Sequence, residues 1–355
     1  MQIQEIVVKR SDLGVTQPQN TTTEPLGEGQ IRLEVEQIGL SANNISYASA
    51  GDALGYWAHF SKDSEWGNVP VWGYSRVIES KVPEISTGEQ IFGFLPMASH
   101  ATFTPVEISE TVFSDRSLQR RELHPWYVRC YRCDKDPAFS RDLLDIQPTL
   151  WALFMTGLMM ADELIGNVDS VYISSASSKT AISLAWALKN SHSPIEIIGL
   201  TSESNAAFVK QLDLYSSVMT YDNLHATDAG TKAAYVDIAG NAGITSAAHV
   251  MLGEKLIDSV LIGATHRAPS AEPLPMPGPT PRFFFIPNVA EERAANDGFE
   301  IYHRHFSDAW LPFAHWAAGW INIERGRGPA AIESGYLANL AGGIPPDRAL
   351  IFSWK

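Results

Sequence analysis

The sequence predicts an α/β protein in which a small, irregular β domain precedes an open parallel sheet. Residues 1 to about 145 consist of short strand-like runs separated by turns, for example at 31–35, 71–78 and 90–94. From about Pro148, helix-like and strand-like segments alternate. This alternation is typical of β-α-β units with right-handed crossovers, which build a doubly wound parallel sheet.

The segments of the alternating part can be assigned in order. We predict strands at 171–175, 195–200, 218–221, 234–238 and 259–262, and helices at 151–165, 179–190, 204–212 and 243–252. Seven prolines then lie between residues 267 and 287. They predict a stiff surface connection back to the first domain, with a lid or a recognition segment as the alternative.

An aromatic stripe follows the prolines. Aromatic residues recur at intervals of three or four, at positions 299, 302, 306, 310, 313, 316 and 320. Such a stripe predicts a buried helix face, with a kink at Pro312. A subunit contact or the lining of a substrate pocket is the alternative interpretation.

Length, charge and cysteine content restrict the class of protein. A chain of 355 residues exceeds what one hydrophobic core usually supports, so two domains are expected. A net charge of −14 disfavours nucleic acids and anionic membranes as partners. No apolar segment suits a signal peptide or a membrane span, so we expect a cytoplasmic protein. Cys130 and Cys133 are interpreted as reduced thiols without a role, with a redox pair as the alternative.

The stretch SSASSKTA, residues 174–181, lies between the first predicted strand and helix of the alternating part. A P-loop is excluded because Ile173 and Ser178 stand where it needs glycine, and a Ser-x-x-Lys nucleophile is excluded because Ala176 stands where it needs serine. A dinucleotide-binding turn remains, in which a diphosphate meets the free amides of a helix start. The alternative is that Ser177 or Ser178 only caps the helix.

Serine can replace glycine in such a turn only in part. Its side chain is small and its hydroxyl can donate to a phosphate, but Ser175 and Ser178 do not adopt a positive φ without cost. The second strand ends in neutral residues, and Thr201 and Ser202 can receive a 2′-phosphate. An NAD site usually has an acidic residue at this strand end, so the neutral residues favour NADP over NAD. If the end of the strand lay one residue later, Glu203 would supply that acid.

Three motifs carry a resemblance to a known superfamily: Ala-Asn-Asn-Ile-x-Tyr at 42–47, Pro-Val-Trp-Gly at 70–73 and the serine turn at 174–181. The chain resembles the zinc-free, quinone-oxidoreductase-like branch of the medium-chain dehydrogenases/reductases. The resemblance implies a chaperonin-10-like irregular β-barrel domain at 1–147 and a Rossmann domain at 148–287. Residues 288–355 would return to the first domain.

The resemblance also implies functional residues. Tyr47, Asn43 and Asn44 match positions of the substrate cleft. Tyr47 is the candidate hydrogen-bond donor to the substrate, or only a pocket-lining ring, and the asparagines orient substrate or stabilise a turn. The residues expected to bind the cofactor are Thr156, Ser175, Ala176, Ser177, Ser178, Lys179, Thr180, Thr201, Ser202, Asn205, Tyr221, Thr265 and His266.

No zinc is expected on this resemblance. The Gly-His-Glu segment of zinc alcohol dehydrogenases is replaced near residues 72–74, and His303 and His305 are two apart on a predicted helix, so they do not share a face. The predicted function is hydride transfer from NADPH to an activated C=C bond or a quinone-type small molecule, in a possible homodimer. The alternative is a nucleotide-binding or scaffold protein without turnover.

Overall fold

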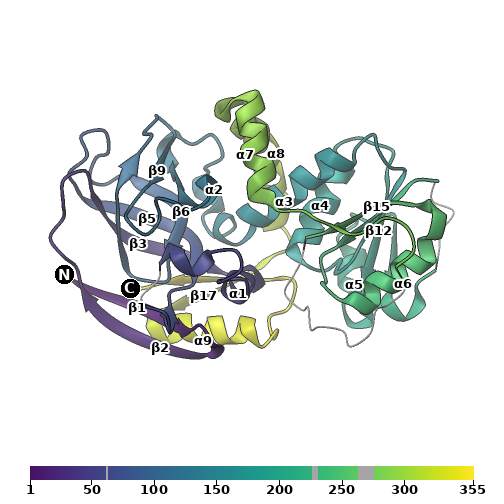
Figure 1. Cartoon of the computed structure of the whole chain (residues 1–355), viewed down its shortest axis with the longest axis horizontal. Helices are drawn as coiled ribbons and strands as arrows, with labels where there is room; N and C mark the ends of the chain where they lie inside the picture. Colours follow the sequence, from purple (N-terminus) through teal and green to yellow (C-terminus); the bar gives the residue numbers. More distant parts are fainter. Residues whose placement is uncertain (61–62, 226–230, 263–275) are drawn as a thin grey trace. The chain divides into compact units, whose positions relative to one another are not determined.

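The computed structural model describes residues 1–60, 63–225, 231–262 and 276–355, and the chain forms two compact units (Figure 1). Unit 1 consists of Met1–Trp151 and Glu300–Lys355, and unit 2 consists of Ala152–Phe299. The domain boundaries expected from the sequence, 1–147, 148–287 and 288–355, remain a proposal.

Unit 1 is built on β-strands. A nine-stranded sheet has the order β17-β18-β3-β5-β6-β10-β9-β8, with β7 also paired to β3, and a second sheet has the order β2-β1-β4. The strands are β1 (Gln2–Lys9), β2 (Asp12–Thr22), β3 (Ile31–Leu40), β4 (Trp66–Gly67), β5 (Pro70–Ser80), β6 (Gln90–Pro96), β7 (His100–Phe103), β8 (Pro105–Val106), β9 (Val112–Asp115), β10 (Arg129–Arg132), β17 (Asn322–Arg327) and β18 (Arg348–Ser353).

Short helices connect these strands. They are α1 (Ala42–Ser49), η1 (Tyr56–His59), α2 (Pro125–Val128), η2 (Cys133–Lys135), η3 (Arg141–Leu143) and α9 (Pro329–Leu340). The strands predicted at 31–35, 71–78 and 90–94 are confirmed as parts of β3, β5 and β6. The backbones of β3 and β5 approach closely at Gly73, where a Cβ atom would lie 2.3 Å from the carbonyl oxygen of Gln37. A side chain at this position would force the two strands apart.

Unit 2 contains a six-stranded sheet of order β13-β12-β11-β14-β15-β16 in which every pair is parallel. This is the strand order of a Rossmann domain. The strands are β11 (Ser170–Ile173), β12 (Glu196–Thr201), β13 (Ser217–Thr220), β14 (Ala233–Asp237), β15 (Leu256–Leu261) and β16 (Arg282–Phe283). The helices are α3 (Gln147–Leu164), which begins in unit 1, α4 (Lys179–Asn190), α5 (Glu203–Gln211), η4 (Tyr221–Asn223), α6 (Ala242–Leu252), η5 (Gly253–Lys255) and α7 (Ile286–Asp297).

The alternating segments predicted from the sequence are confirmed as β11 to β15 and α3 to α6, with ends that differ by up to four residues. The structure adds two elements that begin in the last part of the proline-rich stretch, β16 and α7. The edge strand β16 pairs with β15, and α7 has Pro287 in its first turn, where the missing amide is not needed. Residues 267–275 of that stretch lie outside the described residues.

The aromatic stripe forms a buried helix face, as predicted. Helix α8 (Phe299–Ala318) runs as one element through Pro312, which is exposed, so the ring does not enter the core. Phe306 and Trp310 pack edge-on against Trp151, with ring centroids 4.4 and 5.4 Å away. Burial of these large rings contributes strongly to the core of unit 1.

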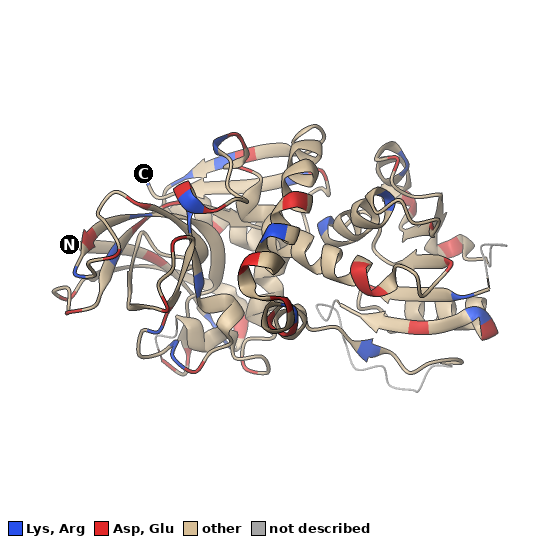
Figure 2. Cartoon of the chain, turned by 90° about the horizontal axis from the view of Figure 1, so that it is seen from above, with Lys and Arg blue, Asp and Glu red and all other residues tan. Residues whose placement is uncertain are grey.

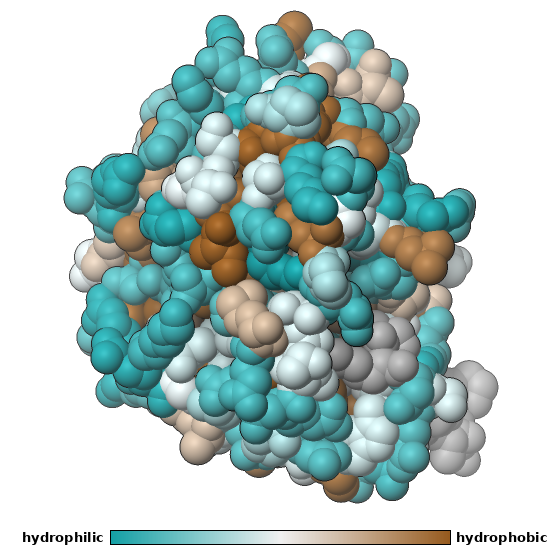
Figure 3. Space-filling view, turned by 90° about the vertical axis from the view of Figure 1, so that its left-hand side faces the viewer, coloured by the Kyte–Doolittle hydropathy of each residue, from teal (hydrophilic) through white to brown (hydrophobic). Residues whose placement is uncertain are grey.

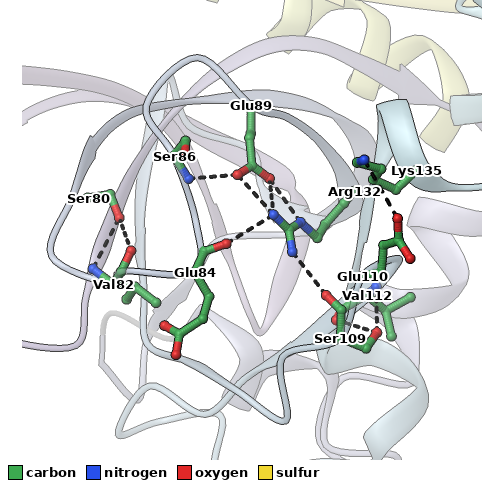
Figure 4. Close-up of polar contacts among 10 residues, drawn as sticks. All are labelled: Ser80, Val82, Glu84, Ser86, Glu89, Ser109, Glu110, Val112, Arg132 and Lys135. Carbon is green, nitrogen blue, oxygen red and sulfur yellow. Dashed lines mark hydrogen bonds and ion pairs between the residues drawn. The ribbon is translucent and has the colours of Figure 1, made fainter.

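Both cysteines are free and buried. Burial is the main cause that raises the pKa of each thiol far above its ordinary value. Between them in sequence, Arg132 forms a two-bond ion pair with Glu89 at 2.9 and 3.0 Å (Figure 4). Arg132 also donates to the carbonyls of Glu84 and Ser109 at 3.0 Å. Arg132 of the C-Y-R-C segment therefore connects β10 to the loops that carry Glu84, Glu89 and Ser109.

Charged residues of both signs are interspersed along the chain, and Figure 2 shows no continuous basic stripe in the described parts. On the face drawn in Figure 3, hydrophobic residues form several patches separated by hydrophilic ones. In the described ranges, no helix has the length and apolar character needed to cross a membrane.

Candidate functional site

The serine turn joins β11 to α4 in unit 2. Ser175 has a φ of +51°, in the left-handed region that glycine usually occupies. Ser174 holds the turn to the neighbouring strand, since its hydroxyl donates to Asp237 at 3.0 Å and accepts from the amides of Ile238 and Ala239. The turn therefore has the backbone shape of a glycine turn at a position where the sequence offers serine.

Several residues expected at the cofactor site meet around this turn. The amide of Ser175 donates to the hydroxyl of Tyr221 at 2.8 Å, and Asn205 donates to the hydroxyl of Ser177 at 3.1 Å. Ala176 is fully buried, and its carbonyl accepts from Tyr215 at 2.8 Å. Burial is the first cause that raises the pKa of Tyr221, so its hydroxyl keeps its proton at neutral pH.

The start of α4 combines a cap with open donors. The side chain of Ser178 accepts from the amide of Ala181 at 3.3 Å, so Ser178 is the N-cap of α4. Capping by Ser177 or Ser178 was one of the two interpretations of the turn. Among the described residues, the amides of Ser177 and Thr180 have no acceptor, and the buried hydroxyl of Thr201 has no partner. Donors at a helix start fit an anion such as a phosphate.

The end of β12 is polar and uncharged up to Ser202. Thr201 is 1% exposed, and Ser202 stands at the N-cap position of α5 with its hydroxyl 2.9 Å from that of Ser204. Glu203 is exposed in the first turn of α5, and Lys210 is exposed in its last turn. The end of this strand therefore presents hydroxyl groups.

Replacing Ser175 with glycine is expected to raise the free energy of unfolding by about 1 kcal/mol, because glycine adopts the left-handed conformation without the steric cost that serine bears. Urea denaturation measures the change. Ser177→Gly is the matched control, since Ser177 has no positive φ and its hydroxyl accepts from Asn205. Equal changes in the two variants would contradict the strained turn.

Other expected cofactor residues have different surroundings. Thr156 lies on α3, and its hydroxyl donates to the carbonyl of Ala152 at 2.9 Å. The neighbouring Gly157 lets α3 approach α4, since a Cβ atom there would lie 2.5 Å from the amide nitrogen of Leu184. Lys179 is the first residue of α4. Thr265 and His266 lie outside the described residues.

Tyr47 of unit 1 lies on α1 and is 4% exposed. Its hydroxyl oxygen accepts hydrogen bonds from Asn43 at 2.7 Å and from Trp72 Nε1 at 3.2 Å. Burial is the main cause that raises the pKa of Tyr47 far above its ordinary value, and the coulombic effect of Tyr56 adds to it. The two hydrogen bonds act in the opposite direction, and the phenol stays protonated at neutral pH.

The two asparagines of α1 differ in role. Asn44 is buried and fixes the helix, because its side chain accepts from the amide of Ser41 at 2.8 Å and donates to the carbonyl of Pro70 at 2.9 Å. Ser41 completes a capping box with Asn44. Asn43 donates to Tyr47 and therefore orients the phenol. These contacts of Asn44 are those of a residue that stabilises a turn, and the orientation of substrate by either asparagine stays a prediction.

Three further residues join Tyr47, and the sequence offered no signal for them. Tyr56, His59 and Tyr127 lie on two short helices, and the hydroxyls of Tyr56 and Tyr127 are 2.7 Å apart. The ring of Tyr47 lies 4.7 Å from that of Tyr56, and the ring of His59 lies 5.5 Å from that of Tyr127. We call Tyr47, Tyr56, His59 and Tyr127 the tyrosine–histidine cluster.

His59 is 2% exposed, and its Nδ1 atom has no hydrogen-bond partner in the described structure. Burial lowers its pKa to about 2, and the cation of Arg120 adds to this effect. In the native state His59 therefore stays neutral at pH values at which the same imidazole in the unfolded chain, with its ordinary pKa of 6.5, is protonated. Stability should fall as the pH falls below that value.

His59→Gln is expected to reduce this acid sensitivity. Between about pH 6.5 and pH 5, the wild-type free energy of unfolding should drop by about 2 kcal/mol more than that of the variant, since each pKa unit corresponds to about 1.4 kcal/mol. Urea denaturation at the two pH values measures the difference. His59→Phe is a second variant that keeps a ring without titrating. The same pH dependence in all three proteins would refute a neutral buried His59.

No cluster of three or more His, Cys, Asp or Glu that could hold a metal ion lies in the ranges that the structure describes. His303, considered above as a possible ligand, instead pairs with Asp136 at 2.6 Å, and both side chains are buried.

Solved structures share this fold over the full chain at low sequence identity. CurA from Vibrio vulnificus is 14% identical with a TM-score of 0.61, covering 100% of this chain and 99% of CurA. A mitochondrial 2-enoyl thioester reductase heterodimer from Candida tropicalis is 12% identical with a TM-score of 0.63, covering 100% of both chains. The CurK enoyl reductase is 13% identical with a TM-score of 0.61, covering 99% of both chains.

These similarities show that the chain has the medium-chain dehydrogenase/reductase fold, with a GroES-like and a Rossmann domain. No curated protein matches the sequence. The model of the family described as "Protein of unknown function (DUF2855)" matches residues 38–345, which is most of the chain. The chain therefore belongs to the DUF2855 family.

Proposed function

We propose that the protein is a zinc-independent, NADPH-dependent reductase that acts on an activated C=C bond or a quinone-type compound. The observation that carries the proposal is the serine turn, which has a left-handed residue at Ser175 and open donors at Ser177, Thr180 and Thr201. The shared fold supports it, since CurK is named an enoyl reductase and CurA also has a structure in complex with NADPH.

In this proposal the diphosphate of the cofactor is bound by the turn and the start of α4. The residues that would hold it are Ser175, Ala176, Ser177, Ser178 and Thr180, and Lys179 in the first turn of α4 is proposed for the 2′-phosphate. The 2′-phosphate would be bound by Thr201, Ser202 and Asn205, with Tyr221 nearby through its bond to Ser175. Thr156, Thr265 and His266 are proposed for the nicotinamide. The cofactor supplies hydride when bound.

The substrate oxygen is proposed to meet Tyr47. A donor fixed before the reaction stabilises negative charge that develops on a carbonyl oxygen as hydride reaches the β-carbon. Asn43 and Trp72 both donate to the phenol oxygen, so the phenol proton is left for the substrate. Asn44 acts as a positioning residue through the helix cap. Reduction of an activated C=C bond in this way needs no Lewis acid.

A second candidate function is that of a nucleotide-binding or scaffold protein without turnover. One observation favours the scaffold role: the amide of Ser175 already donates to the hydroxyl of Tyr221, so a phosphate would have to share this donor or displace the tyrosine. The two candidates differ in whether NADPH is consumed. A small-molecule substrate and a second copy of the chain are the proposed partners, and the Candida tropicalis structure is a heterodimer.

The test is binding followed by turnover. NADPH at about 1 mM is expected to raise Tm, since ligand at 100 times its Kd stabilises a protein by about 2.7 kcal/mol. NADPH oxidation is then followed with enones, quinones and enoyl thioesters. Absence of any Tm shift would remove the reductase and leave a scaffold role, and binding without oxidation of NADPH on the whole panel would leave the non-catalytic nucleotide-binding role.

Lys179→Ala is expected to weaken NADPH binding about tenfold while changing NADH binding less, if the ammonium group contacts the 2′-phosphate. Fluorescence titration of both nucleotides measures the two Kd values. Lys189→Ala is the matched control, because Lys189 lies on the same helix and pairs with Asp213. Equal losses for NADPH and NADH would place Lys179 away from that phosphate.

A further inference from the structure

The amide of Ser175 differs from other amides of the serine turn in the kind of acceptor that it meets. Ala176 donates to the carbonyl of Leu200 at 3.0 Å, and Ser178 donates to the carbonyl of Ser175 at 2.7 Å. Both acceptors are backbone groups of the turn or of the adjacent β12. The amide of Ser175 donates instead to a side chain, the phenol of Tyr221, which lies 46 positions further along the chain. This one bond can therefore be exchanged while the turn keeps its backbone bonds.

The phenol oxygen of Tyr221 lies where an oxygen of a bound anion would lie. It is 2.8 Å from the amide nitrogen of Ser175, within the range of about 2.7–3.2 Å in which an amide meets an oxygen acceptor. An amide has one hydrogen, so a phosphate oxygen at this distance would need the same hydrogen and the same space. In the described part of the chain, Ser177 and Thr180 carry the open amides of the turn. A diphosphate that also uses the amide of Ser175 must displace the phenol.

The backbone before Ser175 is fixed, so the amide cannot turn toward a ligand elsewhere. The hydroxyl of Ser174 donates to Asp237 at 3.0 Å and accepts from the amides of Ile238 and Ala239 at 2.8 and 2.9 Å. Ser174 is fully buried, and Asp237 is 4% exposed. Buried and fully bonded groups of this kind hold one geometry. The tyrosine is therefore the part that has to move.

A second tyrosine also bonds to the serine turn, in the opposite sense. Tyr215 donates its hydroxyl proton to the carbonyl of Ala176 at 2.8 Å. Its ring packs closely on β12, since a Cβ atom at Gly199 would lie 2.9 Å from it. A carbonyl does not bind a phosphate, so Tyr215 takes no donor away from an anion. Tyr221 begins the short helix η4, is half-buried and occupies a donor.

The phenol of Tyr221 is a weaker acceptor than a phosphate oxygen. Burial is the first cause that raises its pKa, the coulombic effect of Asp237 adds to it, and the bond from Ser175 acts in the opposite direction. The phenol is therefore neutral at neutral pH. Hydrogen bonds to charged oxygens are roughly twice as strong as those between neutral groups. A phosphate oxygen thus displaces the phenol, and the bond that is given up reduces the affinity.

We infer that Tyr221 competes with the diphosphate of the cofactor for the amide of Ser175, so that binding exchanges a phenol oxygen for a phosphate oxygen. This inference rests on the proposed binding of NADPH at the serine turn. The sequence placed Tyr221 among the residues that bind the cofactor, whereas here its hydroxyl opposes binding. Ligands that bring no charged oxygen to this position do not displace the phenol.

Tyr221→Phe tests the competition, because it removes the hydroxyl and keeps the ring. The Kd values of NADPH and of pyrophosphate, measured by calorimetry, are each expected to fall about fivefold, the effect of one competing neutral hydrogen bond. Tyr215→Phe is the matched control, since it removes the hydroxyl that bonds to a carbonyl of the same turn. Its Kd values should stay unchanged or rise. Unchanged or weaker binding of both ligands by folded Tyr221→Phe would overturn the inference.

Hydrogen exchange at the amide of Ser175, followed by NMR, tests the contact itself. Without added ligand, this amide should exchange about fivefold faster in Tyr221→Phe than in the wild type, and pyrophosphate should slow it in both proteins. Equal exchange in the two proteins without ligand would overturn the inference. The Tm of each variant is measured to show that it is folded.

The two proposals fail in different ways. If NADPH binds but is not oxidised on the substrate panel, the reductase fails, and the ratio of Kd values for wild type and Tyr221→Phe still decides the inference. If pyrophosphate binds and NADPH does not, the cofactor proposal fails, and the pyrophosphate ratio decides. If neither ligand binds to either protein, there is no anion site for which Tyr221 could compete, and the inference is overturned as well.

Discussion

Replacing Tyr47 with phenylalanine is expected to lower kcat about 100-fold, because removal of one donor to a developing oxyanion costs about 3 kcal/mol in the transition state. The ring and its contact with Tyr56 remain, so substrate packing should change little. Steady-state kinetics at saturating NADPH with an enone substrate measures the effect. The expected split is a low kcat with a KM that changes less.

The control for this variant is Tyr336→Phe. Tyr336 is fully buried in the same unit, and its hydroxyl has no hydrogen-bond partner in the described structure. Losing that hydroxyl should leave kcat unchanged. Tyr47→Phe also leaves Trp72 and Asn43 without an acceptor, so its Tm is measured beside the kinetics. A folded Tyr47→Phe protein with wild-type kcat would rule out Tyr47 as the donor.

Arg120→Met is expected to lower the free energy of unfolding by about 3–5 kcal/mol, the range found when one partner of a buried ion pair is removed. The reason is that Asp115 would stay fully buried without its counter-ion, with only the amides of Thr104 and Ser117 and the Ser117 hydroxyl as donors. Urea denaturation measures the loss. The carbonyls of Tyr127 and Phe94 would also lose a donor.

Two further variants isolate the charge effect. Arg141→Met removes an arginine whose pair with Asp134 is exposed, and it should change stability by less than about 1 kcal/mol. Arg120→Met combined with Asp115→Asn should cost less than the sum of the two single changes, because the stranded charge is removed. Additive losses would show that packing, and not the ion pair, determines the stability at this position.

The sequence predicted most of unit 2 because its signals are local. A buried parallel strand is a short apolar run, and a helix has a 3.6-residue period, so β11 to β15 and α3 to α6 can be found one segment at a time. The same reasoning predicted the buried face of α8. It did not predict β2 and β17, whose residues are largely exposed and polar and whose pairing depends on distant partners.

The sequence by itself determined that a turn of small residues follows a buried strand and begins a helix, because those properties belong to adjacent residues. Only the tertiary structure decided that Ser175 takes a left-handed conformation and that Tyr221 meets its amide from 46 positions away. It also decided that Tyr47, Tyr56, His59 and Tyr127 share one uncharged, aromatic environment. Burial sets their protonation, and burial depends on the packing of segments that are far apart in the chain.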